Sequence, residues 1–301
     1  IHSLTAPIIS TATTSTPTST PTPTPTQSGW KDIHVFYGDQ HNSGLTPAEE
    51  EHLKQHPYVS QEGQDRIVFQ LLNNKTDGFF IDLAANDAIK ISNTYSLETL
   101  HRWTGICIEP NPAYWDDLVF KRKCQLVAAV VGPERMKQVR FRFGLRKDWA
   151  VYSGTVDDQY DNKQHEVFHR LRKGGFIDLP RHQVPIQDIL NRYNAPHTID
   201  YLSLDVEGME AVIMNSYPFH QYPISVLTIE RPTLELETFL FRSGYVFLKV
   251  IANWGETIWA RRNILARLDL TVLNITLQEV LHMSERCYKD HVKCAHHAKS
   301  V

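Results

Sequence analysis

Short, uninterrupted hydrophobic runs recur along the chain, and most are followed by a polar turn and a helical pattern. The runs cover residues 79–83, 105–109, 125–131, 199–205 and 224–230. A run without polar alternation is typical of a parallel strand that is covered on both faces. Strands that alternate with helices in this way predict a right-handed parallel sheet of an α/β fold.

Two further patterns predict an extra strand and the edge of the sheet. Residues 137–143 alternate between polar and apolar side chains and predict an extra strand. Residues 245–251 and 256–260, which flank an Ala-Asn-Trp-Gly turn, predict a closing antiparallel hairpin. The five runs and the two hairpin strands together predict a sheet of roughly seven strands, mostly parallel, with the antiparallel hairpin at one edge.

Helical patterns fill the intervals between the runs and also precede the first of them. Thr46 is placed to cap a helix that has Pro47 at its first position and acidic residues in its first turn. Further helices are expected over residues 60–72, over 92–100, from 111 or 112 to 121, directly after 206–210, and up to 242.

The stretch from residue 144 to 182 breaks this pattern. It is rich in charged, aromatic and glycine residues, and only residues 161–172 have the pattern of a polar helix. An irregular segment of this length inside a compact domain is usually a lid or a substrate-binding loop, and less often a flexible decoration. We expect an insertion with one of these roles.

The patterns divide the chain into four parts, namely a disordered stem (1–29), an N-terminal helical packing segment (30–77), a core with the insertion (78–262) and a C-terminal extension (263–301). The stem is dominated by Thr, Ser and Pro and has no apolar periodicity, which predicts disorder. It is either an O-glycosylated spacer that holds a lumenal or extracellular domain off a membrane, or an ordinary linker. N-glycosylation sequons at Asn74 and Asn274 favour the first alternative.

Composition and charge limit the classes of partner. With 42% hydrophobic and 22% charged residues, the 301-residue chain can bury a full core. Its net charge of -3 leaves no basic excess for phosphates, so nucleic acid is not expected as a partner. No apolar run reaches the roughly 18 residues of a membrane span, so we expect a soluble chain. Because the first residue is not Met, the sequence is compatible with an upstream signal peptide or membrane anchor.

These features favour the secretory pathway lumen (Golgi-like) or the cell exterior as the compartment, with the cytoplasm as the alternative. The four cysteines have no metal-binding spacing, and we expect at least one disulfide. On one straight helix, Cys287 and Cys294 would lie about 10 Å apart, too far to be bridged unless a turn intervenes.

Carboxylates end four of the predicted strands. Asp82 lies near the end of the first run, and Glu109, Asp205 and Glu230 end later ones. Taken singly, each is most simply explained as a helix cap or a surface charge. Because ligands bind at the carboxyl ends of strands in an open α/β sheet, we expect these acids to surround one cleft.

The acids narrow the choice of cofactor. A nicotinamide dinucleotide would need a G-x-G-x-x-G turn for its diphosphate, and neither that motif nor a P-loop occurs. S-Adenosylmethionine fits better, because it carries a sulfonium and an ammonium, has no phosphate, and offers a ribose diol to an acid such as Glu109.

Four motifs now make the sequence recognisable. They are FIDLAAN at 80–86, SNT at 92–94, WTGICIEPNP at 103–112 and SLDVEGME at 203–210. Together and in this order they resemble the FkbM-type methyltransferases, over roughly residues 78–259. The resemblance implies a class I methyltransferase (Rossmann-like) fold, S-adenosylmethionine as the methyl donor, and O-methylation of an acceptor such as a sugar, a glycan or another small molecule with a hydroxyl group.

The resemblance also assigns residues. The turn from Asp82 to Asn86 would hold the methionine end of the cofactor, Glu109 the ribose, and Asp205 with Glu207 the border between cofactor and acceptor. The cofactor-binding candidates are Asp82, Ala84, Asn86, Asn93, Thr94, Glu109, Asn111 and Asp205.

One departure from the family pattern concerns the cofactor turn. Ala84 and Ala88 stand where glycine is usual, and glycine favours positive φ and close approach to a ligand. A left-handed Ala costs on the order of 1 kcal/mol, and Asn86 or Asp87 can adopt that conformation instead. The alternative is a catalytically inactive protein that uses the fold to bind a glycan or a protein partner.

O-Methylation requires an acceptor hydroxyl to lose its proton, which calls for a general base or a metal ion. Asp205 is the first candidate for the base, with Glu207 and Glu230 next. Asp205 and Glu230 could also share a divalent ion, Mg²⁺ or Mn²⁺, through hard oxygen ligands. His182 is a weaker candidate, because any one of 15 histidines is more often a surface residue.

Overall fold

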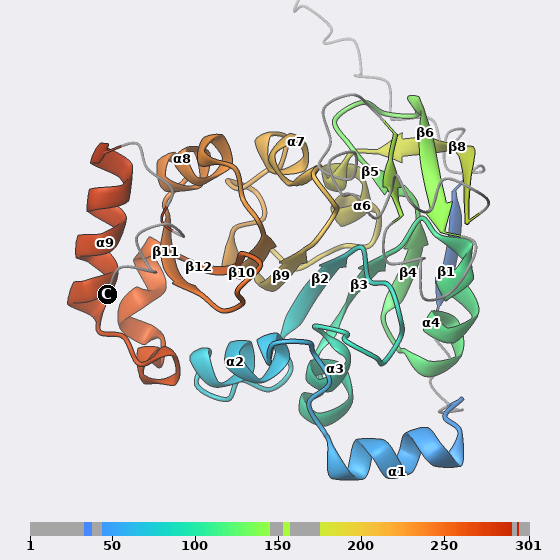
Figure 1. Cartoon of the computed structure of the whole chain (residues 1–301), viewed down its shortest axis with the longest axis horizontal. Coiled ribbons are helices and arrows are strands. Elements are labelled where there is room, and N and C mark those ends of the chain that lie inside the picture. The colour runs from blue at the N-terminus through green and yellow to red at the C-terminus, as the bar shows by residue number, and fades with distance from the viewer. Residues whose placement is uncertain (1–32, 38–43, 145–152, 157–174, 291–293, 295–301) are drawn as a thin grey trace, which may run out of the picture.

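The computed structural model describes residues 33–37, 44–144, 153–156, 175–290 and 294. Its main feature is an eight-stranded sheet in the order β1-β4-β3-β2-β9-β10-β12-β11 (Figure 1). The strands are β1 (His34–Tyr37), β2 (Phe79–Leu83), β3 (Thr104–Ile108), β4 (Gln125–Ala128), β9 (Ile199–Leu204), β10 (Ile224–Glu230), β11 (Tyr245–Val250) and β12 (Glu256–Arg261).

The five central strands, β4, β3, β2, β9 and β10, are parallel, as the uninterrupted hydrophobic runs predict. The predicted hairpin is confirmed, since β12 pairs antiparallel with both β10 and β11. The sheet has one strand more than the roughly seven that were predicted. At the opposite edge, β1 pairs antiparallel with β4. β1 belongs to the segment 30–77, which we expected to be helical. A strand of four residues is too short for the alternation of polar and apolar side chains to be recognised in the sequence.

A second, four-stranded sheet has the order β5-β8-β6-β7. Its strands are β5 (Val130–Val131), β6 (Gln138–Gly144), β7 (Gly154–Thr155) and β8 (Phe176–Val184). This sheet confirms the extra strand at 137–143 and corrects two other predictions. The run 125–131 is split at Ala129 between the two sheets, and the end of the 144–182 stretch is a strand rather than irregular structure. The helix predicted at 161–172 lies outside the described residues.

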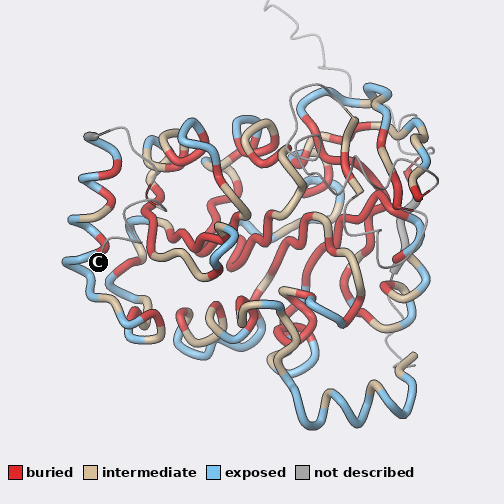
Figure 2. Tube along the Cα trace, in the orientation of Figure 1, coloured by how far each residue is buried: buried red, intermediate tan, exposed pale blue. Residues whose placement is uncertain are grey.

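Helices cover both faces of the main sheet (Figure 1). On one face lie α2 (Gln64–Leu71), α3 (Tyr95–His101) and α4 (Trp115–Lys121), and on the other lie α6 (Ile186–Arg192), α7 (Glu210–Asn215) and α8 (Leu234–Arg242). Two buried hydrophobic clusters correspond to these two interfaces. The strands between them are buried along most of their length (Figure 2). This double coverage explains why the strands appear in the sequence as apolar runs.

The helix starts follow local hydrogen bonds. Helix α1 (Pro47–Gln55) begins as predicted, with a capping box between Thr46 and Glu49. The helix predicted from residue 92 begins instead at Tyr95, because the Ser92 hydroxyl accepts hydrogen bonds from the backbone amides of Thr94 and Tyr95 and forms a separate turn.

Two other predicted helices are close to those observed. The helix predicted over 60–72 is α2, which begins only at Gln64, because Asp65 accepts hydrogen bonds from the Val59 and Ser60 amides in the turn before it. The helix predicted from 111 or 112 to 121 is a 3₁₀ turn, η2 (Pro112–Tyr114), that continues into α4.

The chain beyond β12 continues into helices. They are η5 (Arg262–Arg267), η6 (Leu270–Leu273) and α9 (Leu277–Asp290), and α9 packs against β11. Among the described residues, no helix has both the length and the apolar character needed to cross a membrane.

The expectation of at least one disulfide is confirmed. Cys107 on β3 is bonded to Cys124, which directly precedes β4. Cys287 and Cys294 are buried free thiols that share a hydrogen bond. Cys287 lies on α9, and the Cys294 amide donates to Glu237 on α8 at 2.9 Å.

Candidate active site

The turn after β2 brings the backbone of residues 84 and 85 next to the end of β3. The amides of Ala84 and Ala85 both donate to the Ile108 carbonyl, at 3.0 and 3.2 Å. Ala84 adopts φ = 62° and Asn86 adopts φ = 53°, so both residues take the left-handed conformation that was expected of only one of them. Ala88 is buried without positive φ. The chain therefore accepts the cost of a left-handed alanine at this turn, about 1 kcal/mol.

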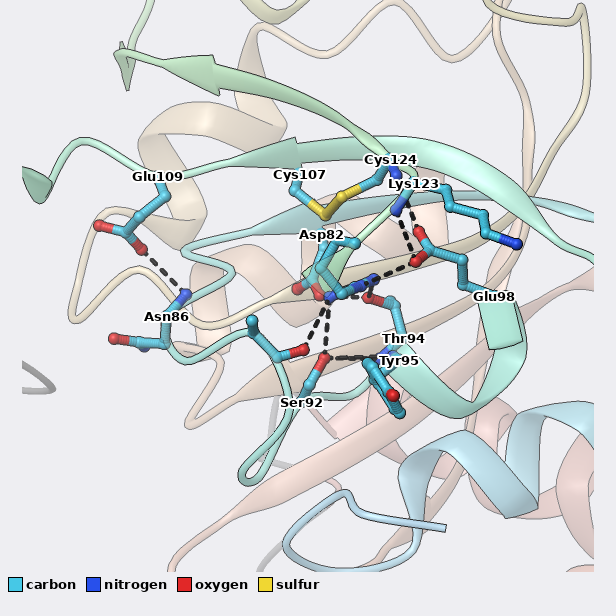
Figure 3. Close-up of a disulfide and its surroundings, with 12 residues drawn as sticks. Asp82, Asn86, Ser92, Thr94, Tyr95, Glu98, Cys107, Glu109, Lys123 and Cys124 are labelled. Carbon is cyan, nitrogen blue, oxygen red and sulfur yellow. Dashed lines mark hydrogen bonds and ion pairs between the residues drawn. A yellow bond between two sulfur atoms is a disulfide. The ribbon is translucent and has the colours of Figure 1, made fainter. Parts of the chain in front are cut away.

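Glu109 closes this turn from the next strand. The Asn86 amide donates to its Oε2 at 3.0 Å (Figure 3). The Asn111 amide donates to its Oε1 at 2.7 Å. Burial raises the pKa of Glu109 to about 7, although these two backbone hydrogen bonds oppose the shift. Each carboxylate oxygen keeps a second lone pair, so Glu109 can still accept two hydroxyl groups from a ligand.

Asp82 is held within the protein. Its Oδ2 accepts from the Thr94 hydroxyl at 2.5 Å, and Ser203 is a second hydrogen-bonding partner. Burial raises the pKa of Asp82, while these hydroxyls and the Arg122 charge oppose the shift. Of the two alternatives for a buried strand carboxylate, pairing inside the protein or waiting for a ligand, the structure shows the first.

Two buried oxygens of predicted site residues have no hydrogen-bond partner within the described part of the chain, namely Asn93 Oδ1 and Asp205 Oδ1. The Asn93 amide nitrogen donates to the Ser203 hydroxyl at 3.0 Å, which fixes the orientation of its side chain. A buried acceptor without a donor destabilises a fold, so both oxygens are suited to receive a ligand's donors.

An apolar pocket lies beside Ala84 and Glu109, at the carboxyl ends of β2 and β3. Its walls include Pro110, Val130, Phe141 and Met209. Ser153 also lines it, and its hydroxyl accepts from the Asn111 side chain at 3.0 Å. Asn111 in turn caps η2 through the Ala113 amide, so its side chain has a structural task. The cavity of about 40 Å³ holds only a few water molecules, so it offers a small apolar recess rather than space for a whole ring.

The second group of predicted residues meets at the ends of β9 and β10. Oxygens of Asp205, Glu207 and Glu230 all lie within 4.8 Å of one another. Arg231 faces this acidic triad, with Nη2 3.0 Å from Glu230 and 3.4 Å from Glu207. Glu207 has φ = 55°, a strained conformation that the turn before α7 imposes on it.

Burial, followed by mutual repulsion, raises the pKa values of carboxyl groups in and beside this triad. Burial raises the pKa of Asp205 well above its ordinary value, and the charges of Glu230 and Glu207 raise it further. Glu256 lies directly opposite Glu230 across the β10–β12 pair. Burial, followed by the Glu230 charge, raises the pKa of Glu256 to about 8. The cluster therefore holds protons near neutral pH.

Sequence reasoning placed some residues well and missed others. Asp205, Glu207 and Glu230 come together as expected, whereas His182 lies on β8 of the second sheet, opposite Gln138. Arg231 and Glu256 were missed. The Glu-Arg-Pro sequence after β10 was a signal for Arg231, but nothing local marks Glu256, because only the strand register brings it to the cluster.

Comparison with known protein families matches residues 82–249 to the Methyltransferase FkbM domain, which is more than half of the chain. The chain belongs to the FkbM methyltransferase family. The FkbM domain begins at Asp82 on β2 and ends within β11, so it contains Glu109 and the whole acidic triad. No curated protein and no solved structure gave a significant match.

Proposed function

We propose that the chain is an S-adenosylmethionine-dependent O-methyltransferase with a class I, Rossmann-like sheet, acting on a hydroxyl of a sugar or glycan. The sheet order supports the fold assignment. From β2 the chain first moves to β3 and β4 and later returns to β9 and β10 on the other side of β2. This reversal is the topological switch point at which open α/β sheets bind ligands.

The main support for the cofactor is the arrangement around Glu109. The two lone pairs that Glu109 keeps can accept hydrogen bonds from a ribose diol, the small apolar recess beside Ala84 can contact the edge of an adenine ring, and Asn93 Oδ1 can accept a hydrogen bond from an ammonium group. None of these groups carries the positive charge that a phosphate would need. S-Adenosylmethionine supplies an electrophilic methyl group on its sulfonium, and the chain's own residues bind and orient the two reactants.

The acidic triad would activate the acceptor by removing the proton from its hydroxyl group. Asp205 is the first candidate for the general base in molecules in which it is ionised, because its raised pKa makes its carboxylate a stronger proton acceptor. Glu207 and Glu230 are held by Arg231 and are the next candidates. Alternatively, Asp205 and Glu230 hold Mg²⁺ or Mn²⁺, for which the 4.8 Å spread of oxygens and the unpartnered Asp205 Oδ1 are suitable.

A sugar acceptor is supported by the surface beside the triad. Trp254, in the turn between β11 and β12, is 41% exposed, and its neighbour Gly255 accepts a hydrogen bond from the Arg231 amide at 3.1 Å. An exposed indole next to carboxylates and a guanidinium offers a stacking face together with hydroxyl-binding groups. The Cys107–Cys124 disulfide and the exposed sequons at Asn74 and Asn274 support the secretory pathway or the cell exterior.

Calorimetric titration with S-adenosylmethionine tests the proposal. We expect one site per chain with a dissociation constant on the order of micromolar, about -8 kcal/mol. A folded sample that does not bind would favour the catalytically inactive alternative, in which the fold only holds a glycan or a protein.

A further inference from the structure

A fully buried ion pair lies beneath the cofactor turn and takes no direct part in the proposed chemistry. The side chains of Arg122 and Glu98 are 0% and 2% exposed, and Arg122 Nε lies 3.2 Å from Glu98 Oε1. Burying two charges costs several kcal/mol, and a pair of apolar residues of similar size is often at least as stable. Stability alone therefore gives no clear reason for this pair.

The Arg122 guanidinium binds one short segment at several points. Its Nη2 donates to the Thr94 hydroxyl at 2.9 Å, and its Nη1 lies 3.3 Å from the Ser92 hydroxyl and 3.5 Å from the Ala88 carbonyl. Thr94 and Ser92 flank Asn93, whose Oδ1 is one of the unpartnered oxygens of the site. One guanidinium thus fixes both neighbours of a proposed cofactor ligand.

The contacts continue from Arg122 to the cofactor strand. The Thr94 hydroxyl that accepts from Arg122 donates to Asp82 at 2.5 Å, so Thr94 links the guanidinium to β2. Thr94 was expected to bind the cofactor, but it is fully buried and its hydroxyl is occupied by these two partners.

Glu98 connects the same network to the disulfide. Its carboxylate accepts hydrogen bonds from the backbone amides of Lys123 and Cys124, at 2.8 and 2.9 Å. Cys124 is bonded to Cys107, which lies opposite Asp82 in the β2–β3 pair. Figure 3 shows Asp82, Thr94 and Glu98 gathered beside the disulfide. The contacts form a closed ring that begins and ends on β2.

We propose that Arg122 is a positioning residue for the cofactor site, and that the Cys107–Cys124 disulfide fixes the ring through which it acts. The ring holds the loop of Asn93 at a set distance from β2, so that the ligand-binding atoms are in place before the cofactor arrives. This inference rests on the proposed function, because the affinity that it explains is that for S-adenosylmethionine.

A matched pair of substitutions at Thr94 tests the link. Thr94→Val removes the hydroxyl that joins Arg122 to Asp82 while keeping the shape of the side chain, and Thr94→Ser keeps the hydroxyl. Calorimetry with S-adenosylhomocysteine should give a dissociation constant about tenfold higher for Thr94→Val and close to that of the wild type for Thr94→Ser. Equal losses in the two variants, or a Thr94→Val constant within twofold of the wild type, would overturn the proposal.

A second comparison uses the two cysteine pairs and remains decisive if Thr94→Val does not fold. Cys107→Ala/Cys124→Ala opens the ring, whereas Cys287→Ala/Cys294→Ala removes two equally buried sulfurs away from it. We expect a clear loss of affinity, about tenfold, only in the first variant. Similar constants in the two variants would overturn the role of the ring. A wild type that binds no S-adenosylhomocysteine would overturn the proposed function as well, which separates the two failures.

Discussion

At the scale of single residues, the site depends on carboxylates whose protonation the fold controls. Glu109 is the clearest case, because burial holds its pKa at about 7 while its two backbone hydrogen bonds orient it. A ribose diol would donate to the carboxylate form, so cofactor binding must remove any proton present. Affinity and pH are therefore linked through this one group.

We predict that the dissociation constant for S-adenosylmethionine is about tenfold higher at pH 6 than at pH 8, because about nine-tenths of Glu109 is protonated one unit below a pKa of about 7. Calorimetry in buffers with different ionisation enthalpies should show proton release near pH 7.

Glu109→Ala should weaken binding of S-adenosylmethionine by about 1.5–3 kcal/mol. Glu109→Gln should abolish the pH dependence, and a variant that keeps it would exclude Glu109 as its source.

Asp205→Asn should leave the cofactor dissociation constant nearly unchanged and lower kcat by about 10² to 10⁴-fold, as expected for loss of a general base. The assay is S-adenosylhomocysteine formation with a saturating acceptor. If Asp205 instead holds a metal, EDTA should abolish wild-type activity and Mg²⁺ or Mn²⁺ should restore it. Asp200→Asn is the matched control, since Asp200 lies at the other end of β9 and pairs with Lys75. Full activity in Asp205→Asn would move the catalytic role to Glu230.

At the scale of elements, the β11–β12 hairpin joins the sheet edge to the acidic triad. Its pairing places Glu256 opposite Glu230, and its turn meets Arg231 through the Gly255 carbonyl. Gly255 has φ = 111°, and a Cβ there would lie 3.1 Å from Arg231 Cγ, so a larger residue would strain the turn. The hairpin thus holds Trp254 at the edge of the proposed acceptor site.

Trp254→Ala should raise the KM for a glycan acceptor by about five- to tenfold, the effect of losing roughly 1 kcal/mol of aromatic contact. The dissociation constant for S-adenosylmethionine should not change, because Trp254 lies beyond the cofactor strands. Tyr288→Ala removes an aromatic side chain of similar exposure on α9 and serves as the control. An unaltered KM in Trp254→Ala would contradict a role of this surface in acceptor binding.

At the scale of the whole molecule, buried acids make stability depend on pH. Burial raises the pKa values of Glu109 and Glu210 to about 7 and that of Glu256 to about 8, from an ordinary value of 4.5. The folded protein retains these protons more strongly than the unfolded chain does. Their contribution to stability is therefore complete below about pH 4.5 and is lost as the pH rises through 7 to 8.

We predict that the Tm of the ligand-free protein is at least about 5 °C lower at pH 8.5 than at pH 5.5, measured by differential scanning calorimetry. Glu256→Gln should reduce this difference, because the amide resembles the protonated acid and cannot ionise. A Tm that is constant or rises over this interval would show that these acids are ionised in the fold.

Some of this architecture is encoded locally. Runs such as 79–83 and 199–205 predict strands because a strand buried on both faces must be apolar throughout. The general rule that ligands bind at strand ends was then enough to bring Asp205 and Glu230 together. The capping box at Thr46 is equally local, since its partners are three residues apart.

Other features were decided only by the tertiary structure. The break of the 125–131 run at Ala129, the position of Glu256 opposite Glu230 and the pairing of Arg122 with Glu98 depend on which distant segments meet. Hydrophobic periodicity reports which side of a segment is buried, but it contains no information about the partner that covers it. By itself the sequence determined the apolar runs of the central strands, the closing hairpin, their order along the chain and the acids at their ends. Packing determined the registers, the charge pairs and hence the protonation of those acids, because a buried charge responds to neighbours that only folding brings within a few ångströms.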